Sequence, residues 1–329
     1  MDKRFRFAIM GAGNIANKFC SAVKLLENCE VTAVSSKSLE RAEQFAKKNG
    51  LAAAYGDYQE MLEKEKPDCV YIAVLPNDHY RLTMLCLDHQ VPVLCEKAMF
   101  MNGQEAETVF ARARQQQVFV MEATWSRFLP AMKQAKAWVR EGKIGPLCYM
   151  ETAIGFRAPQ DENNRYLNAA LGGGAARDVT IYGYELTRLI ADRPILDIQV
   201  QTIWGKTGID LTEHVSLRYE NMLASITTSF ATGIEEKMVI YGETGKIVIP
   251  KPHVAMEAML YNAAGELAVH YEDRETKNGF TYEIQETMDC IRAGKIESEV
   301  VPHSLTLECA RLFDQIADTC WSQQRRNRA

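Results

Sequence analysis

The chain has 329 residues, of which 47% are hydrophobic and 25% charged, a composition typical of a globular protein long enough for two domains. The formal net charge is −5, so no basic excess favours nucleic acid as a partner. No apolar run approaches the ~18–20 residues needed to span a bilayer, and the first residues lack a signal-peptide pattern. We therefore expect neither a nucleic-acid partner nor a membrane partner.

The cysteines and histidines argue against a metal site. Nine cysteines are scattered without a C-x-x-C pair, and the six histidines show no H-x-x-x-H spacing. Most cysteines lie in apolar patterns, as reduced core cysteines do. This favours a reducing, cytoplasmic compartment and predicts no metal. The basic tail, Arg325, Arg326 and Arg328, is expected to be a solvated terminus.

Residues 1–122 alternate apolar strand patterns with helical patterns. Strands are expected at 6–10, 31–35, 69–74, 91–95 and 118–121. Helices are expected at 14–26, from a Ser38 cap to Gly50, from the capping box at 57–60 to before Pro67, at 78–89, and from 102 onward. Repeated strand–helix units of this length predict an α/β domain with a doubly wound parallel sheet.

Residues 123–329 follow a different pattern, with strand-like runs in succession. These runs lie at 147–154, 196–204, 213–219, 222–229, 236–241, 245–249, 256–261 and 267–272. Helices are expected at 131–141, 173–191, 280–293 and 303–320. Short turns such as "GETG" (242–245) favour antiparallel pairing, so this half is predicted to be an α+β domain on an open, mostly antiparallel sheet.

"GAGNIA" (11–16) follows the first strand directly and opens a helix, which is the context that a G-x-G-x-x-G/A motif requires. Gly11 permits the tight turn, and Gly13 lets a pyrophosphate approach the backbone. Asn14 and Ile15 begin the helix, whose free N–H groups favour phosphate. The motif predicts a Rossmann-type dinucleotide site rather than a plain strand–helix turn.

The second strand ends in "SSKS" (35–38), without the acidic residue that normally binds the ribose 2′-OH of NAD. Ser36 and Lys37 would instead suit a 2′-phosphate. NADP(H) is therefore the preferred cofactor, and NAD(H) stays possible because Lys37 is also explained as a solvated loop residue.

Two later strands end in residues suited to the same edge. Leu75, Pro76 and Asn77 end one strand, and Glu96 and Lys97 end the next. Ligands of doubly wound sheets bind beyond the carboxyl ends of the strands, so these residues are expected to flank a nicotinamide. A purely structural Glu96–Lys97 pair remains the alternative.

Several motifs together resemble the Gfo/Idh/MocA family of oxidoreductases. They are "GAGNIA", "LPNDHY" (75–80), "CEKAMF" (95–100) and "LGGGAARDVTIYGYEL" (171–186), while "MEATWSRFLPA" (121–131) is most similar to its dimeric dihydrodiol dehydrogenase branch. The resemblance implies hydride transfer between nicotinamide and a secondary alcohol of a sugar, cyclic polyol or trans-dihydrodiol. It also implies a homo-oligomer, a dimer or tetramer, formed through the C-terminal sheet.

The resemblance assigns roles to individual residues. It places Lys97 near the reacting carbon and maps the substrate residues onto Asp178 and Tyr182, and His79 falls within the cofactor motif. Lys97 would be the proton donor or acceptor, with Tyr182 as the other candidate. A lysine needs desolvation or a nearby cation to act as a base near neutral pH. Asp178 would orient the substrate. Glu96 would position the cofactor and the end of the strand.

Departures from the family pattern leave alternatives open. Ala98 replaces the usual proline, Thr180 stands where glycine is common, and Arg177 stands where an apolar residue is common. Arg177 would bind either an anionic substrate group or a nearby carboxylate. Trp125 and Phe156 form either a wall for a ring-shaped substrate or part of the core. Substrate contact is also considered for three further arginines, Arg127, Arg157 and Arg165.

A regulatory sensor that binds NAD(P) without turnover is the rival function. The presence of Lys97, Asp178 and Tyr182 together favours an enzyme.

Overall fold

The computed structural model describes residues 4–326, and the side chains of residues 4–320. Arg328 and the side chains of Arg325 and Arg326 thus lie outside the described residues. The chain divides into two compact units, one of residues up to Trp125 with 277–310, the other of 126–276 with the residues from Arg311 onward. The sequence pattern does not predict that residues 277–310 return to the first unit.

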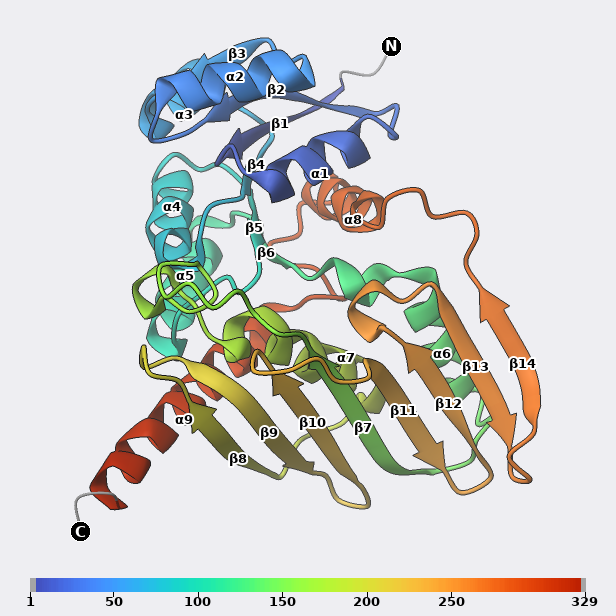
Figure 1. Cartoon of the computed structure of the whole chain (residues 1–329). Helices are drawn as coiled ribbons and strands as arrows, with labels where there is room; N and C mark the ends of the chain where they lie inside the picture. The colour runs from blue at the N-terminus through green and yellow to red at the C-terminus, as the bar shows by residue number, and fades with distance from the viewer. Residues whose placement is uncertain (1–3, 327–329) are drawn as a thin grey trace. The chain divides into compact units, whose positions relative to one another are not determined.

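The first unit contains a parallel sheet of six strands in the order β3-β2-β1-β4-β5-β6 (Figure 1). The strands are β1 (Phe5–Met10), β2 (Cys29–Ser35), β3 (Ala53–Tyr55), β4 (Cys69–Ile72), β5 (Val93–Glu96) and β6 (Val120–Ala123). The helices are α1 (Asn14–Val23), α2 (Leu39–Asn49), α3 (Tyr58–Glu65), α4 (Pro76–Asp88), α5 (Gly103–Gln116), α8 (Phe280–Arg292) and the start of α9 (His303–Arg326). This strand order is that of a doubly wound dinucleotide-binding fold, so the predicted sheet is confirmed.

Local capping explains where several of these helices begin and end. The side chain of Ser38 accepts a hydrogen bond from the backbone N–H of Arg41, and Asp57 accepts one from Glu60. Gly50 ends α2 in the left-handed conformation at φ 73°. These caps are the ones the sequence predicts. The three-residue strand β3 was not predicted, because "AAY" is too short to show a periodicity.

Helices cover both faces of the parallel sheet. One apolar core joins alternate strand residues such as Met10 and Ile72 to side chains of α3, α4 and α5. On the other face, Phe19 of α1 stacks on Tyr71 of β4 with ring centroids 3.8 Å apart, and α8 packs against α1 (Figure 1). Burial on both faces is why these strands read as continuous apolar runs.

The second unit contains an eight-stranded sheet in the order β14-β13-β12-β11-β7-β10-β9-β8. The strands are β7 (Leu147–Gly155), β8 (Asp197–Trp204), β9 (Asp210–Arg218), β10 (Leu223–Ser229), β11 (Lys237–Gly242), β12 (Gly245–Pro250), β13 (Glu257–Asn262) and β14 (Leu267–Glu272). Neighbours are antiparallel except for β10 and β7, which run parallel. The mostly antiparallel sheet is therefore confirmed.

Two helices lie on one face of this sheet (Figure 1). The helix α6 (Pro130–Arg140) packs on β12 and β13, and α7 (Ile181–Ala191) packs on β7 and β10. Alternating side chains of β7, such as Met150 and Ile154, are buried, while Tyr149 and Glu151, on either side of Met150, are half-buried on the other face. Short helical turns complete the unit at Trp125–Phe128 (η1, which begins in the first unit), Ala169–Leu171 (η2) and Pro252–Val254 (η4).

The helix predicted over 173–191 begins later and less regularly than expected. A glycine turn comes first, then a π-helical turn, η3 (Ala176–Thr180), and α7 starts at Ile181. The chain is thus helical from residue 175 to 191, as predicted within two residues, but its first turn is π rather than α. Single π-turns of this kind occur often at functional sites.

Close packing of α7 on β10 yields a stability prediction. A Cβ at Gly183 would lie 2.5 Å from Cγ2 of Ile226, so we expect Gly183→Ala to lower the free energy of unfolding by about 1–3 kcal/mol. Gly233→Ala is the control, because a Cβ there meets nothing within 4 Å, and it should change stability by less than about 0.5 kcal/mol. Urea unfolding measures both, and equal stability of the two variants would contradict the packing described.

Candidate functional site

The carboxyl ends of three parallel strands leave the first sheet at the same edge. Register places Met10 beside Ile72, and Ile72 beside Cys95. The chain therefore leaves β1, β4 and β5 at neighbouring points, and Gly11 and Glu96 are two strand spacings apart, roughly 10 Å. The residues predicted for the cofactor and for proton transfer in this unit are thus brought to one edge.

Gly11 and Gly13 occupy the glycine turn for different reasons. Gly11 has φ +111°, and a Cβ there would lie 2.5 Å from the carbonyl oxygen of Ala73. Gly11 is therefore required by the fold itself. A Cβ on Gly13, in contrast, would meet nothing within 4 Å, and its φ is an ordinary −101°. The open space at Gly13 is the approach that a pyrophosphate would need.

The first turn of α1 lies open beside this space. Gly13 caps α1 with no side-chain hydrogen bond, Asn14 is exposed and Ile15 half-buried. A pocket of about 200 Å³ adjoins the turn, and it is lined by Ala12, Asn17, Arg41, Gln44, Phe45 and Lys48. The sequence motifs did not single out Arg41 or Lys48. Helical spacing on α2 signals their shared face, because residues seven apart lie two turns apart.

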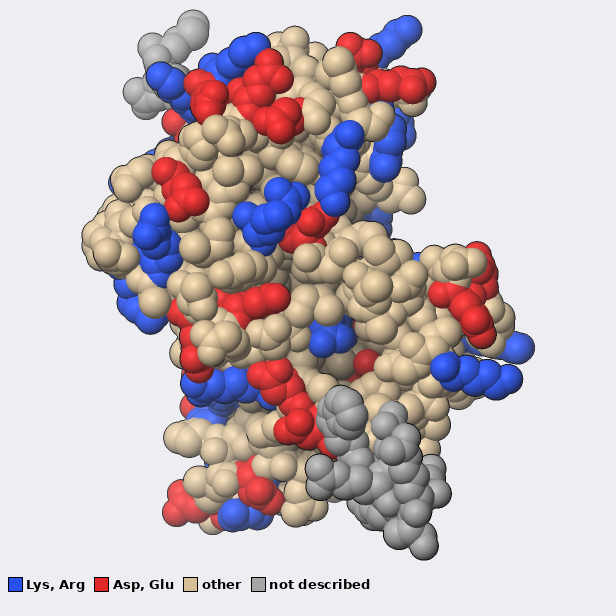
Figure 2. Space-filling model, turned by 90° about the vertical axis from the view of Figure 1, so that its left-hand side faces the viewer, with Lys and Arg blue, Asp and Glu red and all other residues tan. Residues whose placement is uncertain are grey.

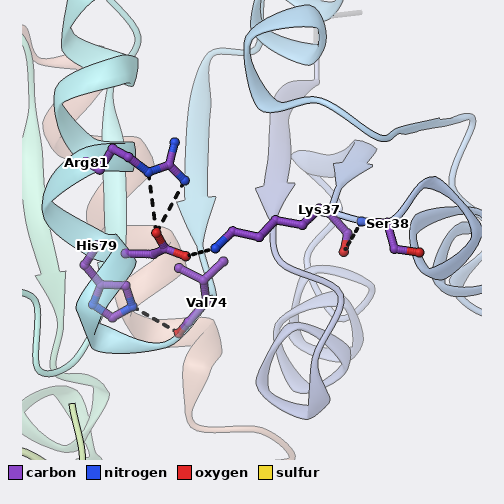
Figure 3. Close-up of polar contacts among 7 residues, drawn as sticks. Lys37, Ser38, Val74, His79 and Arg81 are labelled. Atoms are coloured by element: carbon purple, nitrogen blue, oxygen red, sulfur yellow. Dashed lines mark hydrogen bonds and ion pairs between the residues drawn. The ribbon is translucent and has the colours of Figure 1, made fainter. Parts of the chain in front are cut away.

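The end of β2 is linked to the start of α4 by charge. Nζ of Lys37 lies 2.5 Å from a carboxylate oxygen of Asp78, and Arg81 contacts the other oxygen at 3.4 Å (Figure 3). Burial works to raise the pKa of Asp78, but Lys37 and Arg81 outweigh it, so this pKa lies below its ordinary value. Ser36 is buried beside Lys37, and its hydroxyl accepts from the N–H of Ser38. Lys37 thus sits at the predicted place with a carboxylate partner that the sequence did not reveal.

The imidazole of His79 lies between the carbonyl oxygens of two strand-end segments. It is fully buried, and Nδ1 lies 2.9 Å from the carbonyl oxygen of Ala98. Nε2 lies 3.1 Å from the carbonyl oxygen of Val74, the contact drawn in Figure 3. Burial lowers the pKa of His79, and the neutral ring donates to one of the two carbonyls. His79 therefore holds the chain around Leu75, and its direct contact with a cofactor stays a prediction.

Lys97 stands half-buried at the end of β5, between residues that are held firmly. Glu96 before it is buried and accepts a hydrogen bond from the hydroxyl of Tyr71. Burial raises the pKa of Glu96, while the hydrogen bond from Tyr71 and the charge of Lys97 oppose that rise. The peptide bond between Lys97 and Ala98 is cis.

A second buried carboxyl holds the other side of Lys97. Glu122 at the end of β6 accepts hydrogen bonds from the N–H of Met99 at 2.8 Å and from the hydroxyl of Thr306 at 2.8 Å. Burial raises the pKa of Glu122 to about 7, against the charge of Lys97. The lysine thus lies within the electrostatic reach of two buried carboxyls. Sequence reasoning missed Glu122, because an acidic residue in an apolar strand gives no hint of which backbone group it will meet.

Trp125 packs within the first unit. Its ring centroid lies 5.2 Å from that of Phe280 on α8, and the indole is half-buried. The contact explains Trp125 as part of the packing, and its role toward a substrate stays a prediction.

In the second unit, Asp178 lies at the centre of the π-turn η3. Its carboxylate is 3.6 Å from a guanidinium nitrogen of Arg165, and 20% of its side chain is exposed. The chain reaches this turn through Gly172–Gly174, where a Cβ on Gly173 would meet the carbonyl oxygens of 165, 166 and 168 at 2.7–2.8 Å. The close turn predicted from the three glycines is confirmed. Tyr182 follows on α7, and its ring centroid lies 5.6 Å from that of His253.

The remaining arginines are placed differently from one another. Arg157 is exposed directly after β7, as a residue open to ligands would be. Arg127 is buried and donates to the carbonyl of Glu185, which gives it a structural contact. The guanidinium of Arg177 lies 5.4 Å from the ring centroid of Phe313, near two buried carboxyls, Asp210 and Glu213. Phe156 packs on Tyr166 and Phe230.

The described part of the chain has no cluster of metal-binding side chains and no helix suited to span a membrane. Among residues 4–326, no three His, Cys, Asp or Glu side chains gather where a metal ion could be held. Over the same residues, no helix is both long enough and apolar enough to cross a bilayer. On the face drawn in Figure 2, basic and acidic side chains are interspersed rather than gathered by sign.

Comparison with known proteins agrees with this geometry. Residues 5–124 match the model of an oxidoreductase family with an NAD-binding Rossmann fold, and residues 132–248 match the GFO/IDH/MocA C-terminal domain. The chain is 34% identical over 306 residues to trans-1,2-dihydrobenzene-1,2-diol dehydrogenase of Mus musculus, a match that covers 90% of this chain and 91% of the mouse protein.

Two solved structures share the fold at low identity. Levoglucosan dehydrogenase, in complex with NADH and levoglucosan, has a TM-score of 0.86 and 15% identity, covering 97% of this chain and 98% of that one. A 3-ketoreductase from Actinomadura kijaniata, in complex with NADP and TDP-benzene, has a TM-score of 0.83 and 20% identity, covering 95% and 96%. With the strand order, the glycine turn and the mouse relative, these findings show that the chain belongs to the GFO/IDH/MocA family of NAD-binding oxidoreductases.

Proposed function

We propose that the protein transfers a hydride between a nicotinamide cofactor and a secondary alcohol of a sugar, a cyclic polyol or a trans-dihydrodiol. The observation that carries the proposal is the common edge of β1, β4 and β5. A nucleotide on the open space at Gly13 would extend along an edge on which Lys97 stands two strands away. The names of the relatives support the substrate class, since they act on a dihydrodiol and a sugar derivative.

In this proposal Lys97 moves the proton that accompanies hydride transfer. The cofactor supplies the hydride chemistry, and the alcohol oxygen must lose a proton as it becomes a carbonyl. The buried carboxyls of Glu96 and Glu122 accept hydrogen bonds on either side of Lys97, and both lie within electrostatic reach of its ammonium group. The backbone that carries Lys97 is thereby held in place, which supports a positioned proton donor as general acid–base catalysis requires.

Asp178 and Tyr182 are proposed to bind and orient substrate hydroxyls, with Arg157 and Trp125 as further contacts. Partial exposure of Asp178 leaves a carboxylate able to accept from a ligand while Arg165 holds it. The Tyr182 hydroxyl stays the alternative proton donor.

NADP(H) is proposed as the preferred cofactor. The end of β2 offers Ser36 and Lys37 and no acidic residue, and Arg41 and Lys48 line the pocket beside the glycine turn. Two cations on that pocket favour a 2′-phosphate electrostatically. Against this stands Asp78, which pairs with Lys37 and would repel a phosphate. NAD(H) therefore stays possible, and one similar structure holds NADH while another holds NADP.

The rival function, an NAD(P)-binding sensor without turnover, needs no organised proton donor. The three buried hydrogen bonds that flank Lys97 favour an enzyme, because a sensor does not need the chain around that lysine held in one geometry.

Assembly and compartment are also proposals. Half-buried side chains on the face of the eight-stranded sheet opposite α6 and α7, such as Tyr149 and Glu151, suit a homodimer or tetramer formed through that face. Burial raises the pKa of the Cys20 thiol to about 12 and the pKa of the Cys69 thiol well above its ordinary value. Thiols of this kind stay protonated and unreactive, as reduced core cysteines do, so the proposed compartment is the cytoplasm.

The proton-transfer role of Lys97 predicts a large loss of turnover in Lys97→Met. A panel of sugars, inositols and diols with NADP⁺ and NAD⁺, followed at the nicotinamide absorbance, identifies the substrate. We then expect kcat of Lys97→Met to fall by about 10²- to 10⁴-fold, with the dissociation constant of the cofactor little changed. Lys47→Met, which changes an exposed lysine on α2, is the control. Equal rates for wild type and Lys97→Met would refute the assignment.

The open space at Gly13 predicts a variant that folds normally but binds cofactor poorly. In Gly13→Ala the melting temperature of the free protein should stay unchanged, because the new Cβ meets no atom of the chain. The added methyl group would obstruct the pyrophosphate, so the dissociation constant of the cofactor should rise by about tenfold or more. Calorimetric titration measures it, and unchanged affinity would mean that the nucleotide does not cross this turn.

The Lys37–Asp78 pair predicts opposite effects from its two members. Lys37→Ala should weaken NADP⁺ binding about five- to tenfold while leaving NAD⁺ binding unchanged, because one charge-assisted contact to the phosphate is lost. Asp78→Asn should tighten NADP⁺ binding, since it removes a competing carboxylate. The dissociation constants of NADP⁺ and NAD⁺ for both variants test this prediction. A cofactor preference that neither substitution changes would contradict a role of Lys37 in binding the 2′-phosphate.

A further inference from the structure

Two carboxyl groups are buried side by side beneath the turn that carries Asp178. They belong to Asp210 and Glu213 at the start of β9, with 4% and 0% of their surfaces exposed. Each carboxyl perturbs the titration of the other, and Oε1 of Glu213 is buried without a hydrogen-bond partner. A buried carboxylate oxygen without a donor is unfavourable, and a proton on that oxygen relieves the cost. Neither carboxyl belongs to the motifs that the sequence singled out, and the proposed reaction leaves both without a role.

The surroundings indicate which carboxyl carries the proton. Burial and the charge of Asp210 raise the pKa of Glu213 well above its ordinary value. Burial also raises the pKa of Asp210, but Glu213, the N–H of Ala176 and the charge of Arg177 oppose that rise. The hydroxyl of Thr180 also faces the pair through Glu213, and it does not titrate. A neutral Glu213 with its proton on the unpartnered Oε1 would donate to a charged Asp210 and so satisfy both groups with one proton.

The pair contacts the turn on both sides of Asp178. The N–H of Ala176, two residues before, donates to Asp210 at 2.5 Å. The hydroxyl of Thr180, two residues after, donates to Glu213 and lies 2.6 Å from the hydroxyl of Thr228 on β10. Gly174 completes the fit, because at φ +117° any Cβ would collide with the carboxyl of Asp210. The π-turn is thus fastened to β9 and β10 at its first and last residues.

We propose that Asp210 and Glu213 share one proton and act with Thr180 as positioning residues, which fix the π-turn 176–180 so that Asp178 is presented to the substrate. This inference rests on the proposed function for its last step, since Asp178 matters only if it binds substrate. The fastening of the turn itself can be tested without any substrate.

The first test removes one fastening point and leaves both carboxyls in place. Thr180→Val keeps the shape of the side chain without its hydroxyl, and Thr180→Ser keeps the hydroxyl. We expect kcat/KM to fall on the order of tenfold in Thr180→Val and to stay within about twofold of wild type in Thr180→Ser, with cofactor affinity equal in all three. Amide hydrogen exchange of the peptide 174–182 should rise in the valine variant alone. Equal exchange and equal kcat/KM in the two variants would overturn the proposal.

The second test addresses the shared proton. Glu213→Gln reproduces a protonated glutamate, because its amide donates to Asp210 and its carbonyl accepts from Thr180, so kcat/KM should be retained within about twofold. Glu213→Leu offers neither bond and should lose activity or fail to fold. The infrared difference spectrum of wild type minus Glu213→Gln at neutral pH reads the proton directly. It should contain the C=O stretch of a protonated carboxylic acid, and its absence would refute the shared proton.

The outcomes separate this inference from the proposed function. If wild type turns over no alcohol of the panel, the function fails, while infrared and exchange data still decide whether the pair holds the turn. If wild type is active and Asp178→Asn is impaired, but Thr180→Val is not, the function stands and the positioning role is wrong.

Discussion

The structure depends first on the parallel pairing of β1, β4 and β5, which brings three strand ends to one edge of a sheet. Parallel strands must all leave the sheet on the same side, so whatever follows them in sequence converges in space. Here β1 is followed by the glycine turn, β4 by the segment around Leu75, and β5 by Lys97 directly after its last residue, Glu96. Residues separated by more than eighty positions in the chain thereby become neighbours.

Buried polar groups hold both predicted sets of functional residues, and they do so at a cost that the fold must offset. Burying a carboxyl is unfavourable unless hydrogen bonds or neutralisation compensate for it. Glu96 and Glu122 are compensated by Tyr71, Thr306 and a backbone N–H, and in return they fix the backbone around Lys97. In the second unit, Asp210 and Glu213 do the same for the turn that bears Asp178. Buried carboxyls of this kind contribute little to the free energy of folding, but they hold the backbone in one geometry.

Much of this could be predicted from the sequence where the signal is local. Strand runs such as "CVYIAV", caps such as Ser38 and Asp57, and the turn at Gly11 depend on neighbouring residues, and they were predicted correctly. The parallel pairing of β7 with β10, the π-turn and the Lys37–Asp78 ion pair depend on partners far along the chain, so no local pattern reveals them. The role of Glu122 is hidden for the same reason. Family resemblance named Lys97 and Asp178, whereas their supports became visible only in three dimensions.

The central claim is that the amine of Lys97 reaches the atoms that react, with the nucleotide lying across the glycine turn. A crystal structure of the protein with its nicotinamide cofactor and an alcohol substrate tests this most directly. The account predicts the pyrophosphate over Gly13 and Nζ of Lys97 within hydrogen-bond distance, about 3 Å, of the substrate's reacting oxygen. A nucleotide bound away from that turn, or an amine directed elsewhere, would contradict it.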